Sequence, residues 1–346
     1  MWQFMGNRFP GLRDAFHRNR QGKGLLHSRA ADVLTAVESV VDDTDIKIRL
    51  VSGYKKKLQG TIRDALDFAD DLVSRIPAPI EVSSSTFASD PYVNAFFTNV
   101  TDLQSIFSHS SEVQDYMEAC HDIHTNCCAL LCMHRTEKTV MGMELSGDML
   151  NRDVMQTAVS FSDHRVYSPA PSEPESREGL KKCLFQGLVT KALEQIVQLR
   201  LANHELQSSR QMLHARLRRQ RQELRDVSQA SRTGVDIQQD IEKTGLELRK
   251  TEEQMLHTPA LTPQALLGQV MDVFSKPDDF VRIRKFQLRL NKMGIKISND
   301  SSQPANKLDL TEVIIGNDSP RVVTLATFPR KELLAKTVFS AYQHSG

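Results

Sequence analysis

The chain has 346 residues, a formal net charge of +1, and a composition that is 40% hydrophobic and 6% aromatic. This length is enough for two or three domains, and the near-neutral charge excludes polyanion binding by the surface as a whole, so any such role must come from a local patch. The low aromatic content, with a single Trp, argues against base-stacking platforms.

Cysteine usage favours a reducing compartment. The chain has five cysteines, and four of them lie between positions 120 and 132. A secreted disulfide framework would be even in number and spread along the chain, whereas reduced thiols are typical of the cytosol. The longest apolar run, residues 127–133, is far too short to span a bilayer. We therefore expect a cytoplasmic protein without a transmembrane segment.

The N-terminal residues form a basic segment. Between positions 1 and 31, six arginines and lysines are accompanied by one acid, Asp14, with aromatic residues between them. This composition is shared by transit peptides and membrane-surface patches, but glycines and Pro10 interrupt a continuous helix. We interpret residues 1–28 as a flexible basic arm, with a targeting segment as the alternative.

Residues 29–135 are predicted to form a helical domain. A first helix begins after the capping residue Ser28, and a second begins at Thr44 and ends before Pro77. Short helices follow the cap at Asp90-Pro91. Apolar residues recur at helical spacing through both long helices, which predicts that one side of each is buried.

A capping-box spacing at Ser111 predicts a further helix that extends to about His134. Its stretch 120–134 holds the densest group of potential metal ligands. Three of them would share one helix face at i, i+4 and i+7: Cys120, His124 and Cys127. Thiolates with imidazole suit zinc or copper, but one helix cannot enclose a tetrahedral site, and no second Cys/His pair exists. We therefore favour a buried helix with apolar thiols and predict no metal or cofactor.

The hydrophobic period then changes from helical to alternating. Residues 139–145 and 154–161 are strand-type runs separated by turn residues, which predicts a β-hairpin over 136–168. The polar, Pro-rich residues 169–178 are predicted to be a linker.

Residues 179–257 have the heptad pattern of a coiled coil. Apolar side chains recur on one seven-residue grid at Leu199, Leu206, Leu213, Val227, Ile241, Leu248 and Met255. A heptad has a second set of core positions, which here includes Leu217 and Leu224 and is no longer apolar after Leu224. Residues 228–234 also have the lowest helix propensity of the stretch. We therefore predict a helical hairpin that turns near 230–235. The alternative is an unbroken helix about 115 Å long.

The charges of the two arms support this hairpin. The first arm has seven arginines and three acids, and the second has six acids and three basic residues. A turn near position 232 places Arg225 opposite Asp240 and Arg218 opposite Glu247, so the arms would attract each other when antiparallel. The same complementarity would serve an antiparallel dimer.

Residues 258–346 are predicted to form a small α+β domain. Thr262 caps a helix with Pro263 at its first position. Four strands are predicted, at 280–290, 294–298, 308–315 and 321–328, followed by a closing helix at 330–339. Because the ends of a helical hairpin lie side by side, we expect the strands before and after it to share one sheet.

No catalytic motif is found. The chain lacks a Walker-type phosphate loop, a dinucleotide-binding glycine motif, a nucleophile elbow and a His-Glu-x-x-His sequence. Residues 162–165, Ser-Asp-His-Arg, are interpreted as turn and edge residues. We therefore expect a protein that is not an enzyme.

The predicted fold class is α+β, mainly helical, with an N-terminal helical domain, a coiled-coil helical hairpin and a small antiparallel β domain. The predicted function is that of an interaction or scaffold protein that binds a protein partner or a second copy through the coiled coil. The alternatives are a thiol- or metal-dependent enzyme centred on the stretch 120–134, and a protein that binds nucleic acid or anionic lipid. The last would use the arginines of the first arm: Arg210, Arg216, Arg218, Arg219, Arg221 and Arg225.

Overall fold

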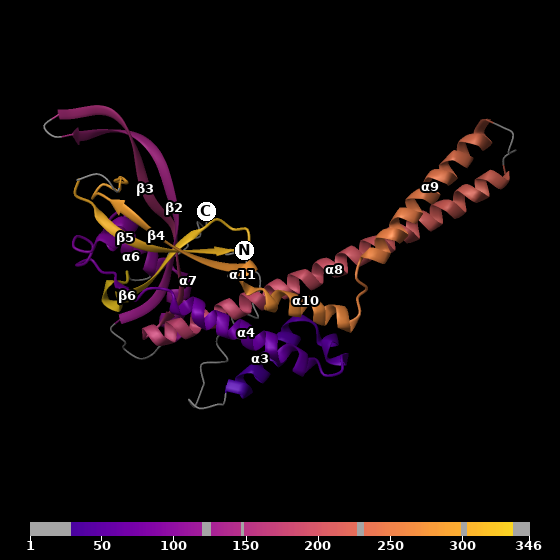
Figure 1. Cartoon of the computed structure of the whole chain (residues 1–346), viewed down its shortest axis with the longest axis horizontal. Coiled ribbons are helices and arrows are strands. Elements are labelled where there is room, and N and C mark those ends of the chain that lie inside the picture. Colours follow the sequence, from indigo (N-terminus) through magenta and orange to yellow (C-terminus); the bar gives the residue numbers. More distant parts are fainter. Residues whose placement is uncertain (1–28, 120–125, 147–148, 227–231, 299–302, 335–346) are drawn as a thin grey trace, which may run out of the picture. The chain divides into compact units, whose positions relative to one another are not determined.

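The structure is a computed structural model that describes residues 29–119, 126–146, 149–226, 232–298 and 303–334 (Figure 1). These residues form two compact units of mixed helix and sheet. The sheet unit contains the described residues from 66 to 185 and from 277 onward, and the helical unit contains those from 29 to 65 and from 186 to 276. Two helices, α4 and α8, have one part in each unit.

The sheet unit is built on one mainly antiparallel sheet in the order β3-β2-β6-β5-β4. Its strands are β2 (Asn126–Ser146), β3 (Met149–Ala170), β4 (Val281–Leu290), β5 (Asn306–Ile315) and β6 (Arg321–Pro329), and the short β1 (Ile80–Glu81) pairs parallel with β6. The strands before and after the long helices therefore share a sheet, as predicted, because β2 lies antiparallel on β6 from Asn126↔Pro329 to Met133↔Val322.

The sheet curls into a half-barrel. A short segment after β4 bonds to both outer strands: its Ile297 N–H donates to Arg289 O, and its Gly294 O accepts from Val159 N–H of β3 at 2.8 Å. Gly294 has φ +75°, a conformation that favours glycine. The strand predicted at 294–298 is thus present only as isolated bridges, which close the edge between β3 and β4.

One face of the sheet packs against three short helices, α5 (Pro91–Phe96), α6 (Val100–His109) and α7 (Ser111–Ala119). Asp90 caps α5 as predicted, since its Oδ1 accepts from the N–H groups of Tyr92 and Val93. The core between helices and sheet includes Phe96, Phe107 and the alternate β2 residues Cys127, Ala129, Leu131 and Met133.

The predicted helix from Ser111 to His134 is wrong from Asn126 onward. α7 ends at Ala119, and Cys127, Cys128 and Cys132 lie in strand β2. The physical reason is that both faces of this strand are buried: Cys127, Leu131 and Met133 enter the core, and Cys128, Leu130 and Cys132 are buried on the opposite face. A short, continuously apolar run has no period that distinguishes a buried strand from a helix.

The predicted linker at 169–178 is also wrong. β3 continues to Ala170 and α8 (Glu173–Asp226) begins three residues later, so the chain has almost no free connection there. Two buried serines fasten this junction: Ser168 Oγ donates to Ser176 O at 3.0 Å, and Ser176 Oγ donates to Ser168 O at 2.9 Å. Proline is compatible with the first turn of a helix, so the Pro-rich composition did not indicate a flexible segment.

The helical unit consists of α3 (Arg29–Thr44), the 3₁₀ helix η1 (Ile46–Leu50), the first part of α4 (Tyr54–Ser74), most of α8, α9 (Arg232–His257) and α10 (Pro263–Ser275). Its core is mainly aliphatic and includes Val37, Ile48, Leu58, Ile62, Ile196 and Leu267, together with Phe274. The nearly buried Asp45 carboxylate accepts from Lys47 N–H and forms an ion pair with Arg200, which joins η1 to α8.

Some predicted helix boundaries in this part of the chain were displaced. Thr44 does not begin the second helix but ends α3, and its hydroxyl donates to Val40 O at 2.6 Å. The second helix begins at Tyr54, after a turn in which Gly53 has φ +68°. The cap at Thr262 is confirmed, since Ala265 N–H donates to its hydroxyl at 3.2 Å.

The predicted closing helix is described only at its start, where Arg330–Glu332 form a 3₁₀ turn. Residues 335–339 of this predicted helix, like the basic arm at 1–28, lie outside the described residues.

Candidate functional site

Helix α9 runs antiparallel to the second half of α8 within the helical unit (Figure 1). His214 Nε2 of α8 lies 3.9 Å from Glu252 Oε1 of α9, and Asn203 Nδ2 donates to Pro259 O at 3.0 Å. Buried or half-buried positions recur along α9 at intervals of three and four, at 234, 237, 241, 244, 248, 251 and 255, and residues 245 and 247 beside them are also half-buried. On α8, Leu217 and Gln220 are buried opposite them.

Two threonines in this seam explain how polar residues are buried there. Thr244 and Thr251 are almost inaccessible to solvent. Their hydroxyls donate to the carbonyl oxygens of Asp240 at 2.8 Å and Glu247 at 3.0 Å, one turn earlier in α9. Because each hydroxyl is satisfied within its own helix, its methyl group is free to pack against α8.

The arginines predicted to bind a partner lie on α8, and all six side chains are exposed. We call this group the arginine surface: Arg210, Arg216, Arg218, Arg219, Arg221 and Arg225. Among the described residues, the ion pair that this group forms is that of Arg219 with Glu223, 2.8 Å apart in the same helix. Neither Arg218 nor Arg225 forms an ion pair with α9 within the described part of the chain, so their charges face solvent.

One part of the arginine surface forms a shallow hollow. Arg210, His214 and Arg218 stand at i, i+4 and i+8 on α8, with Gln211 and Ala215 between them. The small Ala215 side chain leaves room between the long ones, and the guanidinium groups offer forked donors that suit carboxylates and phosphates. This arrangement can bind an anionic group without any catalytic residue.

The proposed cysteine and histidine ligands are not brought together in the part of the chain that is described. Cys120 and His124 lie outside the described residues, and Cys127 is buried in strand β2. Its neighbour Cys128 is buried on the opposite face of the sheet. No group of three His, Cys, Asp or Glu side chains that could hold a metal ion occurs among the described residues.

A polar cluster around Cys132 was not anticipated from the sequence. Burial raises the pKa of the Cys132 thiol to about 12, although the nearby Arg321 and Arg165 act in the opposite direction. Asp163, predicted to lie in a turn, instead sits inside β3 with φ +50° and pairs with Arg321 at 2.5 Å. Burial alone would raise the pKa of Asp163, but hydrogen bonds from Arg321 and Arg165 outweigh it and lower the pKa.

The neighbouring His164 is a structural residue. Burial lowers its pKa, so the ring is held neutral. Its Nε2 lies 2.8 Å from the Phe96 carbonyl oxygen, and its ring stacks on Phe97 with the centroids 5.3 Å apart. These contacts tie β3 to the end of α5.

Cys132 is expected to be unreactive in the folded protein. With a pKa of about 12, its thiolate fraction at pH 8 is about 10⁻⁴, against roughly a quarter for an ordinary thiol. Alkylation by iodoacetamide, followed by peptide mass spectrometry, should label Cys132 only after urea is added. The Met293→Cys variant supplies an exposed thiol as the reference. Equal labelling rates of the two thiols in the folded protein would contradict this expectation.

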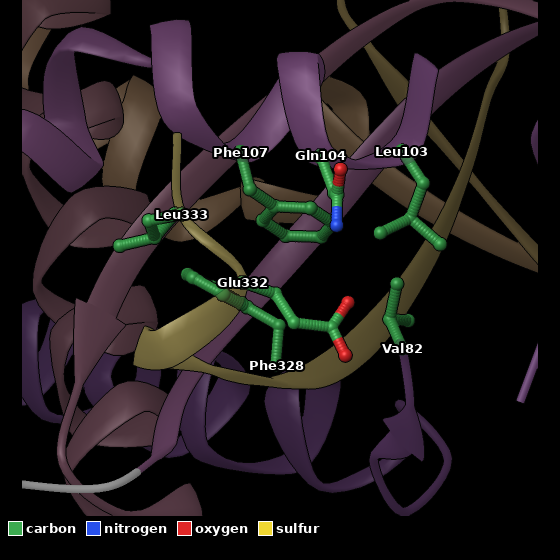
Figure 2. A pocket seen from close by; sticks show the side chains of 7 residues that line it. All are labelled: Val82, Leu103, Gln104, Phe107, Phe328, Glu332 and Leu333. Carbon is green, nitrogen blue, oxygen red and sulfur yellow. The ribbon is translucent and has the colours of Figure 1, made fainter. Parts of the chain in front are cut away.

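A small cavity in the sheet unit lies between α6 and the end of β6. Figure 2 shows its lining, which is Val82, Leu103, Gln104, Phe107, Phe328, Glu332 and Leu333. Glu332 is already engaged, since its carboxylate accepts from Ser84 N–H at 2.8 Å and from Ser84 Oγ at 2.9 Å. The cavity volume is about 10 Å³, which is room for one water molecule and not for a substrate.

Comparisons with protein-family models, curated proteins and solved structures found no match. No helix in the described ranges is both long and apolar enough to cross a membrane.

Proposed function

We propose that this is a non-enzymatic interaction protein that acts through an antiparallel coiled coil of α8 and α9. The observation that carries the proposal is the arginine surface, whose six exposed arginines form no ion pair with α9 within the described residues. Uncompensated positive charge along one helix of a pair favours an acidic partner and speeds its association.

The heptad spacing of the buried positions supports the coiled coil. Residues of α9 that face α8 recur at intervals of three and four over its whole length, which is the periodicity of two helices with a continuous seam. Leu217 and Gln220 of α8 are buried, whereas the six arginines of the arginine surface are exposed and so available to a partner.

The partner that we propose is a protein with an acidic surface. Charge reversal at Arg218, Arg219 and Arg221 should abolish its capture by the full chain. A matched control is charge reversal at Lys56, Lys57 and Arg63, which are exposed on α4 and change the net charge equally. Cross-linking with mass spectrometry identifies the contact, and light scattering separates partner binding from self-association. Equal loss in both variants, or cross-links that avoid α8, would refute the proposal.

A second candidate is a nucleic acid or an anionic lipid surface, and the hollow at Arg210, His214 and Arg218 favours it because it can receive a phosphate. If duplex DNA binds, reversal of Arg218, Arg219 and Arg221 should reduce the slope of log K against log salt by about 0.9 for each phosphate that is no longer neutralised. Fluorescence anisotropy with DNA and RNA, and co-sedimentation with acidic vesicles, measure this. Absence of binding by the parent protein removes this candidate.

A further inference from the structure

The strands β2 and β3 continue past the rest of the sheet as a two-stranded ribbon (Figure 1). β2 leaves β6 after Met133, but its pairing with β3 continues to Ser146↔Met149. A ribbon of two strands has little core of its own, so residues on its faces are exposed unless a ligand covers them.

Three methionines are strongly exposed on one face of this ribbon. Met141, Met143 and Met155 are 69%, 64% and 75% exposed. Met141 and Met155 are directly opposite each other in the antiparallel register. The register shifts between Gly142 and Glu144, where β3 advances three residues against two in β2, so the extra residue of this bulge is on β3. Met143 lies two residues further along the uninterrupted β2 and therefore shares the face of Met141. We call these three residues the methionine triad.

On the opposite face of the ribbon, Gln156 holds the β2 backbone between Met141 and Met143. Gln156 lies over Gly142, where an added Cβ would collide with Gln156 Oε1. The Nε2 of Gln156 donates to Met143 O at 3.1 Å. Because Gly142 has no Cβ, the Gln156 side chain can lie over it and hold the Met143 carbonyl through this hydrogen bond.

The chemistry of the triad is that of three thioether sulfurs. Side chains directly opposite in an antiparallel pair have Cβ atoms about 4.5–5.5 Å apart, and alternate residues of a strand lie about 6.6 Å apart. Methionine has three rotatable bonds, so three side chains at these spacings can converge on one point above the ribbon. Thioether sulfur is a soft donor that selects Cu(I) over harder divalent ions.

We propose that the methionine triad is a binding site for a soft monovalent cation, Cu(I), with the three sulfurs as ligands. No proton is released on binding, because a thioether carries none. The site is separate from α8 and α9, so it does not depend on the function proposed for those helices.

The test uses Ag(I) as a redox-stable probe of the full-length protein, labelled with ¹³C at the methionine methyl groups. In the parent protein, Ag(I) should shift three methyl signals together, and calorimetry should show one equivalent that binds to them. The variant Met141→Leu/Met143→Leu/Met155→Leu keeps the apolar surface but removes the sulfurs, so it should lack both the signals and this binding step.

The matched control is Met212→Leu/Met293→Leu, which removes two equally exposed methionines elsewhere in the chain. It should keep the Ag(I) step of the parent. Binding of Ag(I) to cysteine thiols would appear equally in all three proteins and is thereby separated. If the triad signals do not move, or if the leucine variant binds Ag(I) like the parent, the proposal is wrong and the triad is an apolar surface only.

Discussion

Replacement of Glu312 by Ala is expected to lower the free energy of unfolding of the sheet unit by about 2–3 kcal/mol. The carboxylate of Glu312 is 2% exposed and lies between two arginines, with Arg284 Nη2 at 2.6 Å and Arg135 Nη2 at 3.1 Å. Arg135 itself covers the ring of Phe286 at 4.5 Å. Removal of Glu312 takes away both charge-assisted contacts and leaves Arg135, whose side chain is 21% exposed, without this carboxylate partner.

Urea denaturation followed by circular dichroism measures this loss, and hydrogen exchange of β5 amides locates it. Arg284→Ala is the matched control, because this arginine is 60% exposed and its ion pair with Glu312 is largely screened by water. Its removal should cost about 1 kcal/mol or less. A Glu312→Ala variant as stable as Arg284→Ala would mean that the buried pair does not stabilise the sheet.

Replacement of Phe107 by Ala is expected to cost about 3–5 kcal/mol. Phe107 is 1% exposed and joins α6 to the sheet, since its ring centroid lies 4.2 Å from that of Phe328. It also lines the small cavity of Figure 2, so truncation would enlarge an existing void rather than open an isolated one. Thermal unfolding of the variant gives the loss.

A ligand test makes the Phe107 prediction specific to the cavity. An enlarged apolar cavity binds benzene or xenon, and binding to the folded state raises the melting temperature. Benzene should therefore partly restore the stability of Phe107→Ala and leave the parent and the Phe107→Leu variant almost unchanged. If benzene has no selective effect, the space has closed by relaxation of the surrounding side chains.

Local signals in the sequence predicted several elements well. The caps at Asp90 and Thr262 act between residues only two or three positions apart, so their effect does not depend on the rest of the fold. Strands β4, β5 and β6 were predicted within two residues of their ends, because alternating apolar residues and turn residues bound them. The shared sheet was predicted from chain connectivity.

The helix prediction for the Cys/His stretch failed because local signals there do not distinguish a helix from a strand. Residues 127–133 are apolar at every position, and whether they form a helix or a strand depends on what covers their two faces. Pairing with β6, nearly two hundred residues later in the chain, decided for a strand. Cys127, the described member of the proposed ligand set, is therefore in a strand and not on a helix face.

Of the two candidate sites, one could be identified from the sequence and the other only from the structure. The arginine surface was identified from the sequence, because charged residues within a few turns of one helix lie near each other whatever the fold. The methionine triad was not, because Met155 is brought opposite Met141 by the register of two strands. The Glu312 pair likewise depends on cross-strand register, since Glu312 meets Arg284 across a long connection.

The sequence by itself determined the helix caps, most strand positions, the heptad period of α8 and α9, and the concentration of arginine on α8. All of these arise from interactions between residues close together in the chain. Only the tertiary structure decided the strand at 126–146, the direct junction of β3 with α8, the burial of Cys132 and the grouping of the three methionines. These depend on which distant segment covers each face, and the free energy of that burial is not encoded in any short stretch of residues.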